Sequence, residues 1–211
     1  MWPPHAALLL LIMIEKLFSF DGWYYRTFTF AANLIILNLL FLTTAWTLVL
    51  TGPSLIALYQ SVDRLLKEQG NSVFRDYYRL LAANLKRGTI LVATLLSMAA
   101  VLAGIIYLLM GVSTSLGFLA VVIAALTLLF LAVLTVVYSV LPLPFKSALR
   151  ESSYVLLAST AHGIILMALP VMVAAVLIKV NLMLYVIVGF AVTIWLQLLF
   201  FNKVLVDKTN E

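Results

Sequence analysis

The stretch between Arg87 and Lys146 contains no charged residue, and two apolar runs, 89–110 and 118–140, fill almost all of it. Each run is long enough to cross a hydrocarbon core of about 30 Å as a helix, which needs roughly 20 residues. Backbone N–H and C=O groups in lipid must be satisfied within the protein, so a helix is the only spanning form open to these runs. The chain is therefore expected to be an integral membrane protein.

The composition agrees with a membrane protein, since 65% of the residues are hydrophobic and 10% are charged. Soluble domains carry about 25% charged residues. The net charge of +5 is interpreted as lysines and arginines sorted to the cytoplasmic face of a membrane, and no nucleic-acid partner is expected. The sequence has no cysteine, which excludes disulfides, thiolate metal sites and cysteine nucleophiles.

We predict an all-α fold, a polytopic membrane helix bundle that forms one membrane domain over residues 1–211. Five transmembrane helices are expected, at 28–50, 89–110, 118–140, 154–178 and 182–201. The first is expected to end at Thr51–Ser54, because Pro53 lacks an N–H and Gly52 is flexible. Residues 51–88 are expected to form a cytoplasmic amphipathic helical hairpin.

The distribution of lysine and arginine predicts the orientation. With five spans, the segments 51–88, 141–153 and 202–211 lie on one side and carry ten of the thirteen basic residues. Lys16, Arg26 and Lys179 remain on the other side. Because the positive side is cytoplasmic, the N-terminus is predicted outside and the C-terminus inside.

Residues 1–27 are interpreted as an N-terminal interfacial segment. Ala6–Ile14 is too short to span, and no basic residue precedes it as in a secretory signal. Aromatic residues around Trp23 suit the headgroup layer. Residues 1–12 are alternatively an upstream extension of the reading frame, with Met13 as a natural start.

Residues 73–87 form a strongly amphipathic pattern. Phe74, Tyr77, Tyr78, Leu81 and Leu85 recur at helical spacing. Basic residues occupy a different face and form the candidate contact with a partner or with lipid: Arg75, Arg79, Lys86 and Arg87. We favour contact with anionic lipid of the inner leaflet, and the alternative is a docking surface for another protein.

Few polar groups lie inside the predicted spans, and none is Asp or Glu, which argues against an intramembrane proton relay. The candidates are Asn33, Asn38 and His162. Asn33 and Asn38 are five residues apart and about 140° round a helix, so an interhelical hydrogen bond is expected of each rather than one shared site. His162 is interpreted as a neutral histidine bonded between helices, with a substrate ligand or proton relay as the alternative.

No catalytic constellation is readable. His5 and His162 have no carboxylate within helical reach, so neither a HExxH-type metal site nor a Ser-His-Asp arrangement can be assigned. The chain also lacks a glycine-rich phosphate loop. We expect no enzymatic activity, no metal and no cofactor.

Three motifs resemble the YesL-like family of bacterial membrane proteins, a domain of unknown function. They are Asn33-Leu-Ile-Ile-Leu-Asn-Leu-Leu-Phe41, Thr51-Gly-Pro-Ser-Leu-Ile-Ala-Leu-Tyr59, and Val73-Phe-Arg-Asp-Tyr-Tyr-Arg79 followed by Asn84-Leu-Lys-Arg-Gly-Thr89. The similarity covers about residues 20–90. The chain departs from the family at Thr47 and Leu50, where members often carry Pro and Thr shortly before the Gly-Pro.

The resemblance implies a helical protein of the bacterial cell membrane, encoded beside carbohydrate-uptake transporters of the ABC type. It carries over no catalytic residue. The function expected is a non-catalytic accessory component of carbohydrate uptake that contacts the membrane subunits of a transporter. The alternative is a self-sufficient channel or carrier for a small solute, assembled as a homo-oligomer, with Asn33, Asn38, Ser97 and His162 lining its pore.

Overall fold

The computed structural model describes residues 23–69, 72–158 and 160–209, and all its regular elements in these ranges are helices. In chain order they are α2 (Trp23–Thr44), α3 (Leu48–Leu66), α4 (Val73–Ala83), α5 (Leu85–Val112), α6 (Thr114–Val140), α7 (Phe145–Ala158), α8 (Thr160–Val180), α9 (Leu182–Leu184), a π-helix (Tyr185–Gly189) and α10 (Phe190–Thr209). The expected interfacial segment falls outside the described residues up to residue 22, as do Ala6–Ile14 and the proposed extension 1–12.

The described chain contains five helices that are long and apolar enough to cross a membrane. These candidate spans are Tyr24–Thr44, Leu85–Gly111, Ser115–Val140, Thr160–Val180 and Leu182–Lys203. The prediction of an all-α protein with five membrane-length helices is confirmed at this level. The chain is therefore a multi-pass membrane protein by the length and composition of its helices.

The first helix ends earlier than predicted, at Thr44 rather than near Leu50. Thr44 donates its hydroxyl hydrogen to the Leu40 carbonyl, and the Thr51 hydroxyl donates to the Ala45 carbonyl, which satisfies acceptors at the end of α2. Thr47 then adopts an extended conformation and is the N-cap of α3. The expectation that Gly52 and Pro53 end a helix was wrong, because Pro53 lies inside α3.

The segment predicted as a cytoplasmic hairpin contains the most buried helix of the described chain. In α3, the side chains of Ile56, Ala57, Leu58 and Val62 have no exposed surface. The helix packs against α2, α4, α5, α6 and α10. It can therefore carry more polar residues than a lipid-facing span, because protein rather than lipid surrounds it.

Helices α2 and α3 form an antiparallel hairpin. The turn at 45–47 joins them at one end, and at the other end the Arg26 guanidinium pairs with the Glu68 carboxylate. The predicted topology placed these two residues on opposite sides of the membrane. In the structure the ion pair places the end of α3 beside the start of α2.

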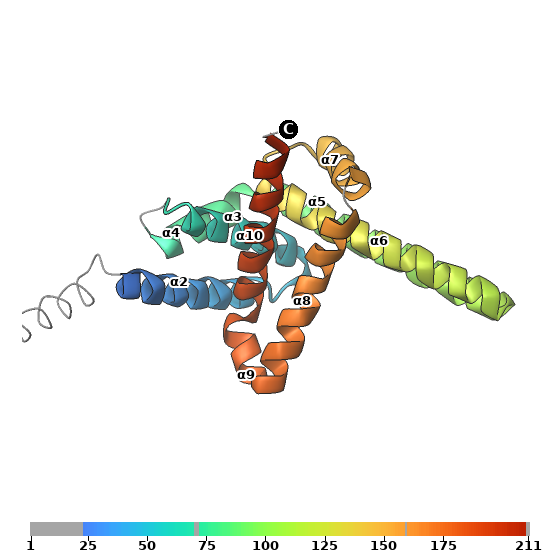
Figure 1. The fold of residues 1–211 in the computed structure, drawn as a ribbon, viewed down its shortest axis with the longest axis horizontal. Coiled ribbons are helices and arrows are strands. Elements are labelled where there is room, and N and C mark those ends of the chain that lie inside the picture. The colour runs from blue at the N-terminus through green and yellow to red at the C-terminus, as the bar shows by residue number, and fades with distance from the viewer. Residues whose placement is uncertain (1–22, 70–71, 159, 210–211) are drawn as a thin grey trace, which may run out of the picture.

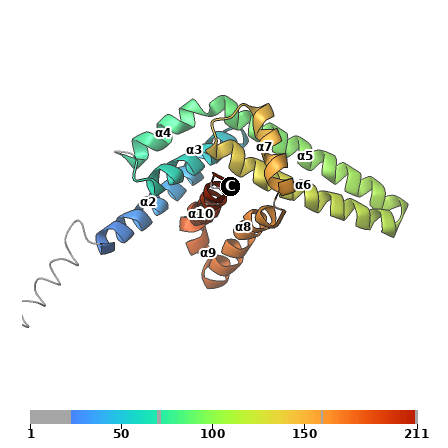
Figure 2. The same ribbon diagram turned by 45° about the horizontal axis from the view of Figure 1, so that its top comes forward.

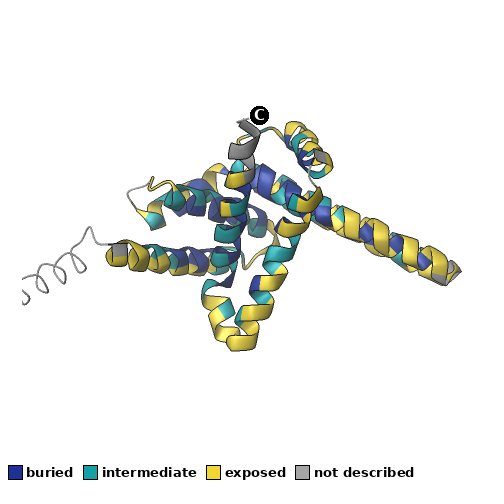
Figure 3. Cartoon of the chain, viewed as in Figure 1, coloured by how far each residue is buried: buried dark blue, intermediate teal, exposed yellow. Residues whose placement is uncertain are grey.

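Helices α5 and α6 form a long hairpin that extends well beyond the other helices (Figure 1), and the turned view shows the same projection (Figure 2). A single residue, Ser113, separates the two helices, and its hydroxyl accepts a hydrogen bond from the Leu116 amide at 3.2 Å. The outer part of the hairpin is largely exposed (Figure 3), including Tyr107 at 82% and Phe118 at 73%. Apolar surface on this scale is suited to lipid or to another membrane protein.

The fourth predicted span, 154–178, is divided between two helices. Helix α7 ends at Ala158, and α8 covers Thr160–Val180. The last span starts at Leu182 as predicted but contains the π-helix before α10. Helices α8 and α10 pack together, and α8 also packs against α6 while α10 packs against α3.

Candidate functional site

The surface formed by α4 and the start of α5 carries the basic residues that the sequence indicated as a contact. Arg75, Arg79 and Lys86 are all exposed, and we call them the basic surface. Arg79 Nη2 lies 3.7 Å from Asp76 Oδ1, and Arg64 Nη1 lies 3.9 Å from the same oxygen. These are loose, partly exposed pairs, so each contributes little to stability, and the basic surface keeps a net positive charge.

The apolar pattern of α4, which continues to Leu85 at the start of α5, is only partly used for packing. Tyr77 is fully buried, whereas Phe74, Tyr78 and Leu85 remain 55%, 49% and 46% exposed. Tyr77 shares a hydrogen bond of 2.6 Å with the Thr44 hydroxyl, and burial raises the pKa of the Tyr77 hydroxyl although this hydrogen bond opposes the shift. Exposed aromatic rings beside arginines fit a lipid headgroup layer or a protein contact.

Arg87, the fourth basic candidate, is directed into the protein. Its Nη2 donates to the carbonyl oxygens of Tyr138 at 2.8 Å and Leu141 at 3.0 Å, and its guanidinium lies 4.8 Å from the centre of the Tyr138 ring. A cation at the end of α6 stabilises the last carbonyls of that helix. Arg87 therefore caps α6, unlike the three residues of the basic surface.

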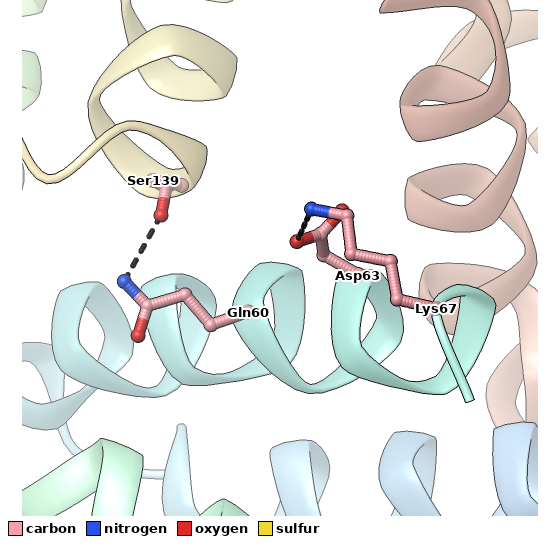
Figure 4. A network of polar contacts seen from close by, with 4 residues as sticks. All are labelled: Gln60, Asp63, Lys67 and Ser139. Carbon is pink, nitrogen blue, oxygen red and sulfur yellow. Dashed lines mark hydrogen bonds and ion pairs between the residues drawn. The ribbon is translucent and has the colours of Figure 1, made fainter. Parts of the chain in front are cut away.

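Amides next to Arg87 connect three helices. Asn84 Nδ2 donates to Gln60 Oε1 at 2.9 Å, and Gln60 Nε2 donates to the Ser139 carbonyl oxygen at 3.1 Å. Figure 4 shows Gln60 of α3 reaching Ser139 of α6, while Lys67 and Asp63 on the same helix pair with each other at 2.6 Å. These contacts tie the start of α5 and the end of α6 to α3.

Asn38 joins α2 to the last span. The side chain is fully buried, Nδ2 donates to the Val186 carbonyl oxygen at 2.7 Å, and Oδ1 accepts from the Ala191 amide at 3.0 Å. Both partners flank or lie within the π-helix, where the α-helical bonding pattern is interrupted. The interhelical hydrogen bonding expected of Asn38 is present, and its partners are backbone groups.

The other polar candidates lie apart from Asn38. Asn33 is half-buried and lines a cavity between α2, α3 and α4. His162 is half-buried, with its ring 5.4 Å from the ring of Phe200 on α10. Ser97 is exposed on α5, and its hydroxyl donates to the Thr94 carbonyl. The structure thus does not bring the four suggested pore residues together within one chain.

The sequence reasoning missed a buried polar contact at Gln197. This side chain is 4% exposed; its Oε1 accepts from the Tyr59 hydroxyl at 2.5 Å, and its Nε2 donates to the Leu166 carbonyl at 2.9 Å. The sequence feature that could have predicted this contact is an amide side chain inside an apolar run. Such a side chain usually faces other helices rather than lipid.

No group of three His, Asp or Glu side chains that could hold a metal ion occurs in the described parts of the chain. Asn38, Asn84 and Gln197 bond between helices and Arg87 caps α6, whereas Asn33 lines a cavity.

Residues 34–112 match a family described as proteins of unknown function, DUF624. The matched segment runs from α2 through α5 and includes Asn38, α3 and the basic surface. No curated protein and no solved structure matches the chain.

Proposed function

We propose that this protein is a non-catalytic accessory component of a membrane transporter, which it contacts through its membrane helices and its basic surface. The supporting observation is the use of polar groups inside the candidate spans. Asn38 and Gln197 bond to backbone groups of neighbouring helices, and Ser97 bonds within its own helix. These described side chains are engaged within the protein, so the monomer is poorly equipped to line a path for a polar solute.

The exposed α5–α6 hairpin also supports a membrane partner. Its outer surface is apolar, and its length beyond the other helices offers a second membrane subunit a large packing area.

The link to carbohydrate uptake rests on the resemblance to the YesL-like family, with which the match over residues 34–112 is consistent. That family's genes stand beside ABC-type sugar transporters. The proposed partners are accordingly the membrane subunits of such a transporter in a bacterial cell membrane. The competing channel requires Asn33, Asn38, Ser97 and His162 to meet across an oligomer interface, although Asn38 is fully buried inside the monomer.

We further propose an orientation with the N-terminal end of α2 on the cytoplasmic side. The basic surface marks its own side as cytoplasmic. Arg26 at the start of α2 pairs with Glu68 at the end of α3, close in sequence to that surface. Among the basic residues of the described helices, this orientation leaves only Lys179 on the opposite side, a more uneven distribution than the five-span prediction had.

Co-purification tests the proposed function. The protein is expressed with the neighbouring transporter genes and purified in a mild detergent, where we expect the transporter's membrane subunits to accompany it. Charge reversal of Arg75→Glu and Arg79→Glu together should abolish this association. The matched control reverses Lys146→Glu and Arg150→Glu on α7, which are also exposed and should leave association intact.

Reconstitution of the protein alone provides the opposing measurement. We expect no sugar flux into vesicles that contain only this chain. Flux that changes on substitution of His162 or Asn38 would establish the channel instead.

A further inference from the structure

A cavity of about 370 Å³ lies between α2, α3 and α4. Its polar lining consists of Asn33, Ser61, Arg64, Gln69, Ser72 and Asp76. A second cavity of about 290 Å³ adjoins it along α2 and shares Asn33, Leu65 and Gln69 with it. The first volume falls within the range of small-molecule sites, roughly 300–1,000 Å³.

The charges around both cavities are matched in pairs. In the first, Arg64 lies 3.9 Å from Asp76, and in the second, Arg26 pairs with Glu68. An anionic ligand would therefore be repelled by the carboxylate that lies beside each guanidinium. A cationic ligand would be repelled by the guanidinium that lies beside each carboxylate. This lining favours a ligand without net charge.

The uncharged groups provide both donors and acceptors. Ser61 is 6% exposed, lines the first cavity, and its Oγ has no hydrogen-bond partner within the described structure. An unsatisfied buried hydroxyl is unfavourable, and because Ser61 lines the cavity, a ligand seated there would supply the missing partner. The amides of Asn33 and Gln69 each offer two donor hydrogens and an acceptor oxygen.

The remaining walls are apolar, with Leu37 on α2, Leu65 on α3 and the partly exposed ring of Phe74 on α4. Amides and hydroxyls beside apolar walls suit a molecule with several hydroxyl groups and a carbon skeleton between them. We propose that this cavity binds a small uncharged polyhydroxylated molecule, with Ser61 and Asn33 as its hydrogen-bonding partners. The inference concerns a ligand of the lone protein and does not depend on a transporter partner.

The test measures binding to the protein alone in nanodiscs of phosphatidylcholine, a lipid whose headgroup carries no hydroxyl group. Glucose, myo-inositol and glycerol serve as uncharged probes, and inorganic phosphate and choline serve as charged comparators. We expect saturable binding of at least one uncharged probe by calorimetry or saturation-transfer NMR, and no binding of either charged comparator.

Ser61→Ala should weaken binding roughly five- to tenfold, because it removes one hydrogen bond without filling the cavity. Asn33→Leu should abolish it. Ser139→Ala is the matched control, since Ser139 Oγ is also buried and unpaired but does not line either cavity. Its binding should equal that of the unaltered protein, and thermal unfolding should confirm that all three variants fold.

The proposal is overturned if none of the three uncharged probes binds at concentrations up to roughly 100 mM, about the weakest specific affinity worth measuring. That result would assign the cavity to water. Equal binding of the charged comparators, or affinities unchanged by both Ser61→Ala and Asn33→Leu, would also overturn it. Because no transporter is present, a negative result here leaves the co-purification experiment unaffected.

Discussion

Asn38 is a single buried amide that satisfies two backbone groups of another helix. Its oxygen accepts from the Ala191 amide and its nitrogen donates to the Val186 carbonyl, on either side of Gly189. Insertion of a side chain into a helical hydrogen-bond pattern is a known cause of local distortion. The π-helix and Asn38 are therefore best regarded as one unit.

Substitution Asn38→Leu should lower the free energy of unfolding by about 1–2 kcal/mol, because two interhelical hydrogen bonds are lost and two backbone groups remain unsatisfied. Denaturant unfolding in detergent measures the change. Asn33→Leu, the same substitution on the half-buried face of the same helix, is the control and should have a smaller effect. Equal losses in the two variants would contradict the assigned role of Asn38.

At the scale of elements, the crossing of α3 and α5 depends on two glycines. A Cβ on Gly52 would overlap the Gly88 carbonyl oxygen, and a Cβ on Gly88 would overlap the backbone nitrogen of Pro53. Two of the segments that carry the family resemblance, Thr51–Tyr59 and Asn84–Thr89, thus meet at this crossing. The family motif at these two segments therefore corresponds to a packing contact, because small residues let helix backbones approach closely.

Gly52→Ala should therefore force α3 and α5 apart and destabilise the protein by about 3 kcal/mol, at the upper end of the usual cost of overpacking. Gly104→Ala is the matched control on α5, since no atom lies within 4 Å of a Cβ at that position. There the substitution should be neutral or stabilise by up to about 1 kcal/mol through helix propensity. Thermal unfolding in detergent measures both, and a tolerated Gly52→Ala would contradict the close crossing.

At the scale of the whole molecule, the α2–α3 hairpin decides on which side the first described helix begins. The chain contains no cysteine, so single cysteines can be introduced and labelled with an impermeant reagent in intact cells. Thr27→Cys and Ser72→Cys should both be protected, because the Arg26–Glu68 pair places them at the same end of the hairpin. Ser113→Cys, at the tip of the α5–α6 hairpin, should react.

Labelling of Thr27→Cys together with protection of Ser72→Cys would restore the five-span topology and contradict the proposed orientation. Trp46→Cys adds further information, because Trp46 is 89% exposed at the turn between α2 and α3. Its reaction from outside would show that the two helices cross the membrane as a pair. Its protection would show that they lie along the cytoplasmic surface.

The class of the protein and most of its long helices follow from the sequence alone. Charge-free runs of membrane length leave the backbone only one way to satisfy its hydrogen bonds, so α5, α6 and the last span were predictable from local composition. The amphipathic α4 and its exposed arginines follow from helical periodicity in the same way. These properties depend on neighbours along the chain.

The arrangement of these elements depends on contacts between residues distant in the sequence, and only the tertiary structure decides it. Helix α3 looks too polar for a span, yet it is central because other helices rather than lipid surround it. Arg87 at the start of α5 and Asn33 in the middle of α2 are both polar residues, but one caps α6 and the other lines a cavity. Sequence periodicity gives the direction in which a side chain points from its own helix. The residue that the side chain contacts depends on which other helix packs against that face.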